Sequence, residues 1–148
     1  MSTTKKWTGA GGAIVYKNQL LMMLRDDKPG LRFANKWDFA GGRRNNSDDS
    51  PEACFIRETQ EEFGITIVPE MICYKQLYPN LSTGVTDSYF FVAEVTKTDI
   101  QNIAFGTEGQ GWTLFTPAEF FSHPDVIAPL KQRYQDYLDS VPMNSADS

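Results

Sequence analysis

The sequence lacks a long hydrophobic run: no stretch approaches the ~20 apolar residues that a membrane-spanning helix needs. Residues 1–7 also lack the hydrophobic core of a secretory signal peptide. A basic run is missing too, and the net charge is −5, which argues against non-specific binding to nucleic acid or to an anionic membrane. We therefore expect a cytoplasmic protein whose partners include no nucleic acid polymer and no membrane.

Histidine and cysteine are scarce. His123 is the only histidine, which disfavours a Ser–His or Cys–His catalytic triad elsewhere in the chain. The two cysteines, Cys54 and Cys73, have no metal-ligand spacing. Reduced thiols in a cytoplasm are their simplest explanation.

The composition is that of an ordinary globular protein, with 41% hydrophobic residues in a chain of 148. This length suits one domain and is too short for two. Apolar and alternating stretches predict strands at 7–16, 20–24, 37–40, 65–78, 88–95 and 112–115. We expect an irregular segment at 97–111, a helical turn at 117–121 and a helix at 125–138. This order predicts an α+β fold with a mixed sheet flanked by helices.

One further helix, at 51–63, has clear end signals. Ser50 is a good N-cap, and Pro51 occupies the first helical position, where its missing N–H costs nothing. Gly64 follows the last periodic residue, as a glycine that ends a helix should. The helix therefore begins and ends at predictable residues.

Three acids share one side of this helix. Glu58, Glu61 and Glu62 are three and four residues apart, so their side chains are neighbours. They lie near the negative end of the helix dipole and repel one another, at a cost of about 0.3–1 kcal/mol each. A solvated acidic face is the ordinary interpretation. The other is a site for a hard divalent cation, Mg²⁺ or Mn²⁺, because the cluster contains carboxylates without His or Cys.

The spacing of these acids is more specific than a solvated face requires. Gly41-Gly42 followed by Arg57-Glu58-x-x-Glu61-Glu62-x-Gly64-Ile65 resembles the Nudix box of the MutT-like hydrolases. The loop half departs from the family pattern: counting back from Arg57, Asp49 stands where the family has Glu. Six residues instead of five separate Gly42 from Asp49, and Thr59 stands at an aliphatic position.

The resemblance implies a Nudix-type α/β/α sandwich over residues 5–138 of a single domain spanning 1–148, with a polar tail at 139–148. It implies Mg²⁺- or Mn²⁺-dependent cleavage of a pyrophosphate bond in a small nucleotide substrate, with water attacking phosphorus. Nudix domains often form homodimers, although no exposed apolar stripe in this chain requires one. The alternative is a non-catalytic Nudix-fold module that binds a nucleotide as a sensor.

The resemblance also assigns the metal site. Glu61 and Glu62 correspond to metal ligands, and the carbonyl group of Gly41 helps to hold an ion. Glu58 is either a ligand or the general base, and both roles remain open. Gly42 allows the backbone to approach the substrate closely.

Three further residues are candidates outside the carboxylate cluster. Arg57 is expected to orient a carboxylate through a forked ion pair, where its alternative is a surface salt bridge. Glu108, in a loop before the last strand, resembles a further acid of MutT-type sites and is a candidate ligand or base. Arg25, at the end of its strand, resembles a substrate-contacting Arg of that group. The alternative for both Glu108 and Arg25 is an ordinary solvated charge. The polar loop at 80–87 is a candidate specificity loop.

Overall fold

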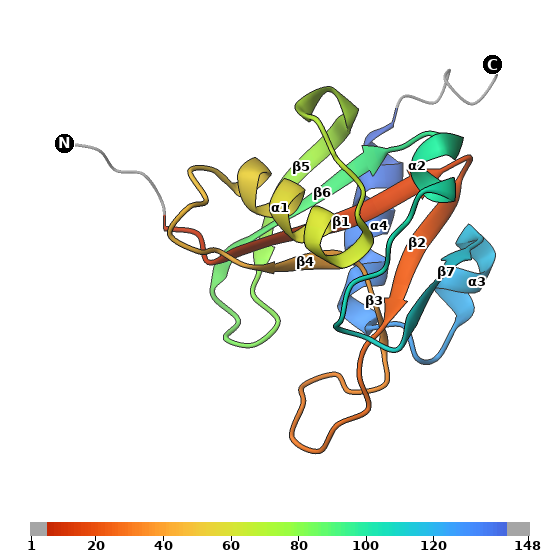
Figure 1. The fold of residues 1–148 in the computed structure, drawn as a ribbon. Coiled ribbons are helices and arrows are strands. Elements are labelled where there is room, and N and C mark those ends of the chain that lie inside the picture. The colour runs from red at the N-terminus through yellow and green to blue at the C-terminus, as the bar shows by residue number, and fades with distance from the viewer. Residues whose placement is uncertain (1–5, 142–148) are drawn as a thin grey trace.

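The computed structural model describes residues 6–141. It has three layers, with a seven-stranded mixed sheet between α1 (Pro51–Phe63) on one face and α4 (Ala128–Ser140) on the other (Figure 1). Two shorter helices, α2 (Lys97–Gln101) and α3 (Pro117–Ser122), lie in the connections. The predicted α/β/α sandwich is confirmed.

The sheet is built around its first strand. Its strands are β1 (Gly9–Tyr16), β2 (Gln19–Leu24), β3 (Trp37–Asp38), β4 (Ala40–Arg43), β5 (Ile72–Pro79), β6 (Thr86–Glu94) and β7 (Gly111–Phe115). The order is β3-β2-β1-β6-β5, while β4 pairs with β1 and β7 pairs with β2. Among the strand pairs of residues 6–141, β1 and β6 run parallel and the others are antiparallel. β1 therefore lies between β4 and β6, and this places β4 beside the helix that carries the acids.

Side chains alternate between two cores. In β2, Leu21 and Met23 pack on the α1 side, whereas Leu20 and Met22 pack on the side of α3 and α4. This alternation follows from the two-residue period of a strand. Both faces of β2 are buried, which explains why its sequence is a continuous apolar run.

Some predicted boundaries were wrong. The expected strand at 37–40 divides into β3 and β4 at Phe39. The strand expected from residue 65 begins at Ile72, after a 3-10 turn, η1 (Pro69–Met71), because Pro69 favours a turn over a ladder position. The segment 97–111 contains α2, whose N-cap Thr96 forms a capping box with Asp99.

The C-terminal helix also differs from its prediction. It begins at Ala128 rather than Asp125 and continues through Ser140. Asp139 and Ser140 are therefore helical and do not belong to the tail expected at 139–148, whose residues 142–148 lie outside the described residues. Across residues 6–141, no helix is both long enough and apolar enough to cross a membrane.

Candidate active site

Helix α1 has the predicted ends. Ser50 Oγ accepts a hydrogen bond from the Ala53 N–H at 3.1 Å, which satisfies one of the free donors of the first turn. At the other end Gly64 has φ +70 and donates its N–H to the Gln60 carbonyl at 2.9 Å. These two caps set where the acids of the last two turns lie.

A pair of glycines in β4 lets α1 approach the sheet. A Cβ on Gly42 would lie 2.4 Å from the Glu58 carboxylate, so a larger residue there would displace Glu58. Gly41 has φ +153 and its Cβ would lie 2.5 Å from the Gly11 Cα. Its N–H donates to Glu62 Oε1 at 3.1 Å. Glycine at both positions therefore brings two carboxylates onto the backbone of β4.

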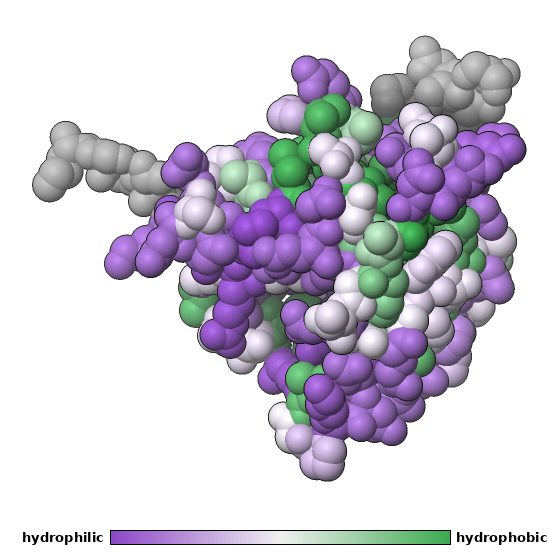
Figure 2. Space-filling model, in the orientation of Figure 1, coloured by the Kyte–Doolittle hydropathy of each residue, from purple (hydrophilic) through white to green (hydrophobic). Residues whose placement is uncertain are grey.

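The three acids of α1 differ in exposure. Glu58 and Glu62 are half-buried against β4, and the Glu58 side chain is 16% exposed, whereas that of Glu61 is 58% exposed. On the face of the molecule shown in Figure 2, hydrophilic residues cover the area over α1 and the loop before it. The acidic side of the helix is therefore only partly solvated.

Burial raises the pKa of Glu62 to about 9, although the hydrogen bond from the Gly41 N–H acts in the opposite direction. The nearby charges of Glu58, Asp38 and Glu108 contribute to this rise as smaller causes. Each of these causes disfavours the ionised carboxylate except the hydrogen bond. A cation beside Glu62 would reverse the sign of this electrostatic environment.

Burial also raises the pKa of Glu58, opposed by the adjacent Arg57, with Glu61 and Glu108 adding repulsion. The ion pair joins Arg57 Nη1 to Glu58 Oε2 at 3.2 Å. Glu58 is thus a carboxyl group with an elevated proton affinity beside the glycine pair.

Arg57 joins the helix to the loop before it. Its Nε and Nη2 atoms donate to Asp48 Oδ1 at 3.0 Å and Oδ2 at 2.9 Å, in a forked pair. Nη2 also donates to the Arg43 carbonyl at 3.0 Å, and Nη1 donates to both Glu61 oxygens at 3.2 Å. Asp48 is 3% exposed, and its hydrogen bonds from Arg57 lower its pKa to about 2.

The acid that meets Arg57 is Asp48, so the assignment of the family position to Asp49 was wrong. Asp49 is exposed. Asp48 follows Gly42 by the family's five intervening residues, so the extra residue of this chain lies between Asp48 and α1. Counting forward from Gly42 places the acidic position of the family pattern at Asp48, whereas counting back from Arg57 places it at Asp49.

Glu108 lies in an anchored loop. The Gly106 N–H donates to the Glu62 carbonyl at 2.9 Å, and Gln110 Nε2 donates to the Arg25 carbonyl at 2.8 Å. The Glu108 side chain is exposed, and its charge raises the pKa of both Glu58 and Glu62. The fold therefore brings a fourth acid within electrostatic range of the cluster.

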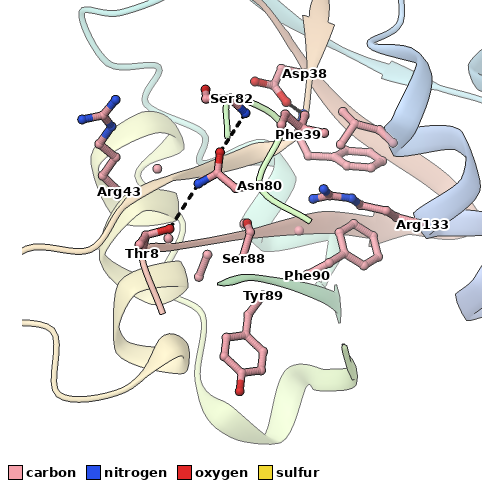
Figure 3. A pocket seen from close by; sticks show the side chains of 18 of the residues that line it. Thr8, Asp38, Phe39, Arg43, Asn80, Ser82, Ser88, Tyr89, Phe90 and Arg133 are labelled. Carbon is pink, nitrogen blue, oxygen red and sulfur yellow. Dashed lines mark hydrogen bonds between the residues drawn. The ribbon is translucent and has the colours of Figure 1, made fainter. Parts of the chain in front are cut away.

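A cavity of about 460 Å³ shares the glycine pair with the acids. Its lining comes from β1, β4, β6 and the loop at 80–83, together with Arg25, Asp38 and Phe39 and two residues of α4, Leu130 and Arg133 (Figure 3). The loop is held to the residue before β1 by the Asn80 side chain, which donates to Thr8 Oγ1 at 3.2 Å. The predicted specificity loop thus borders a cavity whose wall includes Gly41 and Gly42, the residues that Glu58 and Glu62 contact from α1.

A family model described as NUDIX domain matches residues 6–138. The chain belongs to this family. No curated protein matches the sequence. The predicted family resemblance is confirmed.

Solved Nudix structures share the fold at low identity. A MutT protein from Methanosarcina mazei Go1 superposes with a TM-score of 0.69 at 20% identity, covering 95% of this chain and 100% of that chain. A C. elegans Ap4A hydrolase in a binary complex gives 0.62 at 17% identity, covering 90% and 99%. A bifunctional NMN adenylyltransferase/ADP ribose pyrophosphatase from Francisella tularensis, complexed with AMP and a Mn ion, gives 0.65 at 15% identity, covering 93% and 43%.

The oxygen donors of the Nudix box suit a hard divalent cation. Within residues 6–141, no three or more His, Cys, Asp or Glu side chains form a ready-made ligand group. Glu58 and Glu61 are instead held by Arg57, and Glu62 is held by the Gly41 N–H. Their carboxylate oxygens fit such an ion by their chemistry, and to ligate it they would turn from these partners toward the ion.

The candidate residues of this Nudix chain fall into two groups. Gly41, Gly42, Glu58 and Glu62 meet at one place, and Arg57, Glu61 and Glu108 surround it. Arg25 lies apart on the cavity wall, where its Nη1 pairs with Asp38 Oδ2 at 3.3 Å.

Asp38, Asp48 and Arg133 were not predicted from the sequence. Only Asp48 had a detectable sequence signal, its spacing from Gly42. Asp38 and Arg133 are far apart in the chain, and only the fold brings them to the same cavity.

Proposed function

We propose that this Nudix protein is a Mg²⁺- or Mn²⁺-dependent hydrolase that cleaves the pyrophosphate bond of a small nucleoside diphosphate-linked substrate. The observation that carries the proposal is the common wall formed by Gly41 and Gly42, with the carboxylates of Glu58 and Glu62 and the cavity meeting at it. A phosphate chain at this wall would reach the acids while the rest of the substrate occupied the cavity.

Each box residue has a proposed role. Glu61, Glu62 and the Gly41 carbonyl group hold the ion, with Glu58 as a further ligand or as the base. When bound, such an ion neutralises phosphate oxygens and lowers the pKa of water. Arg57 positions Glu58 and Glu61 through its ion pairs.

The reaction transfers one proton to a carboxylate of the chain. The oxygen of water forms a bond to phosphorus as the bond from phosphorus to the bridging oxygen breaks, which leaves that oxygen on the departing phosphate group. Glu58 or Glu108 accepts the proton of water at a carboxylate oxygen. The raised pKa of Glu58 favours this role, because a base works best when its pKa lies near the working pH.

Arg25 and Gly42 are proposed to bind substrate from the cavity side. Arg25 donates to Asp38 and to the Arg32 carbonyl, so its guanidinium is already oriented.

A cytoplasmic location is supported by two free cysteines, Cys54 and Cys73.

A metal-dependent nucleotide sensor without catalysis is the second candidate. This candidate is favoured by the ion pairs of Arg57 with Glu58 and Glu61, because they hold both carboxylates away from a shared metal position. The two candidates differ in turnover and share the binding site.

The test is phosphate and pyrophosphate release from dNTPs, 8-oxo-dGTP, ADP-ribose, dinucleoside polyphosphates and nucleotide sugars, with Mg²⁺, Mn²⁺ or EDTA. We expect metal-dependent turnover of at least one compound, lost in Glu62→Gln and kept in Glu70→Gln, an exposed acid on η1. Tight metal-dependent binding without turnover across the panel would establish the sensor. Turnover in EDTA at the rate seen with metal would overturn the metal site.

A further inference from the structure

Arg133 is a charged side chain buried at the wall of the cavity. It is 8% exposed and belongs to α4, yet it lines the cavity together with residues of the sheet. Figure 3 shows its guanidinium group pointing from the helix into the cavity. A buried guanidinium is costly unless its N–H groups and its charge have partners.

The partners of Arg133 use only some of its hydrogen-bond donors. Its Nη2 donates to the Pro79 carbonyl at 2.7 Å, and its Cζ lies 5.0 Å from the centre of the Tyr78 ring. A guanidinium has five N–H donors. Among residues 6–141, Pro79 is the only hydrogen-bond acceptor found for Arg133, and no carboxylate forms an ion pair with it. The remaining donors are available to a ligand in the cavity.

Arg133 shares the cavity with other charged side chains. Asp38 lines the same cavity, and its charge acts on Arg133. Its carboxylate already accepts from Arg25 and from the Phe39 N–H. Because Arg25 offsets the charge of Asp38, the charged groups alone admit either a phosphate or a neutral acceptor beside Arg133. The aromatic rings that line the same cavity favour the neutral acceptor.

The walls near Arg133 suit a flat ring. Phe39 and Phe90 line the cavity with their rings 5.9 Å apart, and Tyr78 lies beneath the guanidinium. Aromatic walls favour planar apolar faces, and a guanidinium is a common hydrogen-bond donor to ring carbonyl oxygens such as O6 of a purine. The combination fits a nucleobase that presents a carbonyl oxygen to Arg133.

We propose that Arg133 is a specificity-determining residue that donates hydrogen bonds to a ring carbonyl oxygen of the nucleobase, so that the cavity selects oxo bases over their amino counterparts. This inference rests on the proposed function, because it takes the cavity as the seat of the nucleoside. An amino group at the same ring position would present N–H groups to N–H groups and leave Arg133 unpaired. Sites built to hydrogen-bond one substrate group reject analogues that lack it.

The experiment is calorimetric binding of IMP and AMP, and of UMP and CMP, to the full-length protein in Mg²⁺. Each pair differs in a ring carbonyl against an amino group. We expect the oxo member of at least one pair to bind about ten- to a hundredfold more tightly, the range of a hydrogen bond to a charged group. Arg133→Met should weaken that member by a similar factor and change its amino counterpart by less than about twofold.

Two controls separate specificity from structure. Arg44→Met removes another Arg that stacks on an aromatic ring, Trp7 at 4.3 Å, but does not line the cavity, and it should change no affinity. Arg133→Lys keeps a cation and should retain part of the preference. Thermal unfolding of each variant shows whether loss of the Pro79 contact alone disturbs the fold.

Several results would overturn the inference. Equal affinity of the wild-type protein for both members of both pairs would do so, as would its failure to bind any of the four. If Arg133→Met lost affinity equally for oxo and amino nucleotides while its affinity for inosine, which has no phosphate, was unchanged, the acceptor would be a phosphate instead. Oxo-selective binding without hydrolysis of any substrate would reject the proposed catalytic function and leave this inference standing.

Discussion

Glu62 of α1 accepts a hydrogen bond from the Gly41 N–H of β4 at 3.1 Å, across 21 residues of sequence. Its neighbour on the same side of the helix, Glu58, lies against Gly42. These two contacts couple the acidic helix to the strand that borders the cavity.

Stability without metal should depend on pH through Glu62. Its pKa rises from an ordinary 4.5 to about 9 on folding, so the folded state binds more protons than the unfolded state between these values. The free energy of unfolding should therefore fall as pH rises from about 5 to 9, by on the order of 2 kcal/mol after solvent screening of this half-buried group. Chemical denaturation in EDTA at several pH values measures this change.

Glu62→Gln should remove most of that pH dependence and leave the protein as stable as the wild type at pH 9, or more so. Mg²⁺ should stabilise the wild-type protein at high pH but not the variant, because a ligand that binds only the folded state raises its stability. A wild-type protein whose stability is flat from pH 5 to 9 in EDTA would contradict this account.

Asp48 and Asp49 should behave differently when changed. Asp48→Asn leaves Arg57 without its buried forked partner and should cost about 2–4 kcal/mol of stability, whereas Asp49→Asn should cost within about 0.5 kcal/mol. Urea unfolding of the two variants makes the comparison. Equal effects would mean that the Asp48–Arg57 pair does not hold the loop to α1.

The same pair should be sensitive to acid. The pKa of Asp48 is lowered to about 2, so its contribution to stability is present above about pH 4 and is lost as pH falls toward 2. Asp48→Asn should reduce the loss of stability across this range relative to the wild type. An unchanged acid transition in the variant would contradict the assignment.

Gly42→Ala tests the close approach of β4 to α1. The new Cβ would lie 2.4 Å from the Glu58 carboxylate, whose flexible end can move away. We expect kcat to fall about tenfold or more with a stability loss below about 1 kcal/mol, because only a side chain is displaced. Gly111→Ala is the control, since a Cβ there meets nothing within 4 Å. Equal activity of the two variants would show that the position of Glu58 is unimportant.

The general base can be assigned from pH–rate profiles. Glu58 is half-buried with a raised pKa, whereas Glu108 is exposed. We therefore expect Glu58→Gln to lower kcat by about a hundredfold or more and to abolish the acidic limb of the profile. Glu108→Gln should lower kcat less and keep that limb. The reverse pattern would assign the base to Glu108.

The sequence by itself determined the features that depend on nearby residues. The ends of α1 followed from Ser50, Pro51 and Gly64, because caps satisfy backbone groups within a single turn. The spacing of Glu58, Glu61 and Glu62 identified the Nudix box, because helical geometry makes these residues neighbours. The layer order of the fold followed from the order of its strands and helices.

The tertiary structure decided what depends on distant contacts. Whether Asp48 or Asp49 meets Arg57 depends on the path of the loop after Gly42, and loop paths are set by anchors at both ends. The different exposures of Glu58, Glu61 and Glu62 arise from the packing of α1 on β4. Arg133 became a candidate only when α4 placed it in the same cavity wall as Asp38, because side chains so far apart in the sequence meet through packing and through no local pattern.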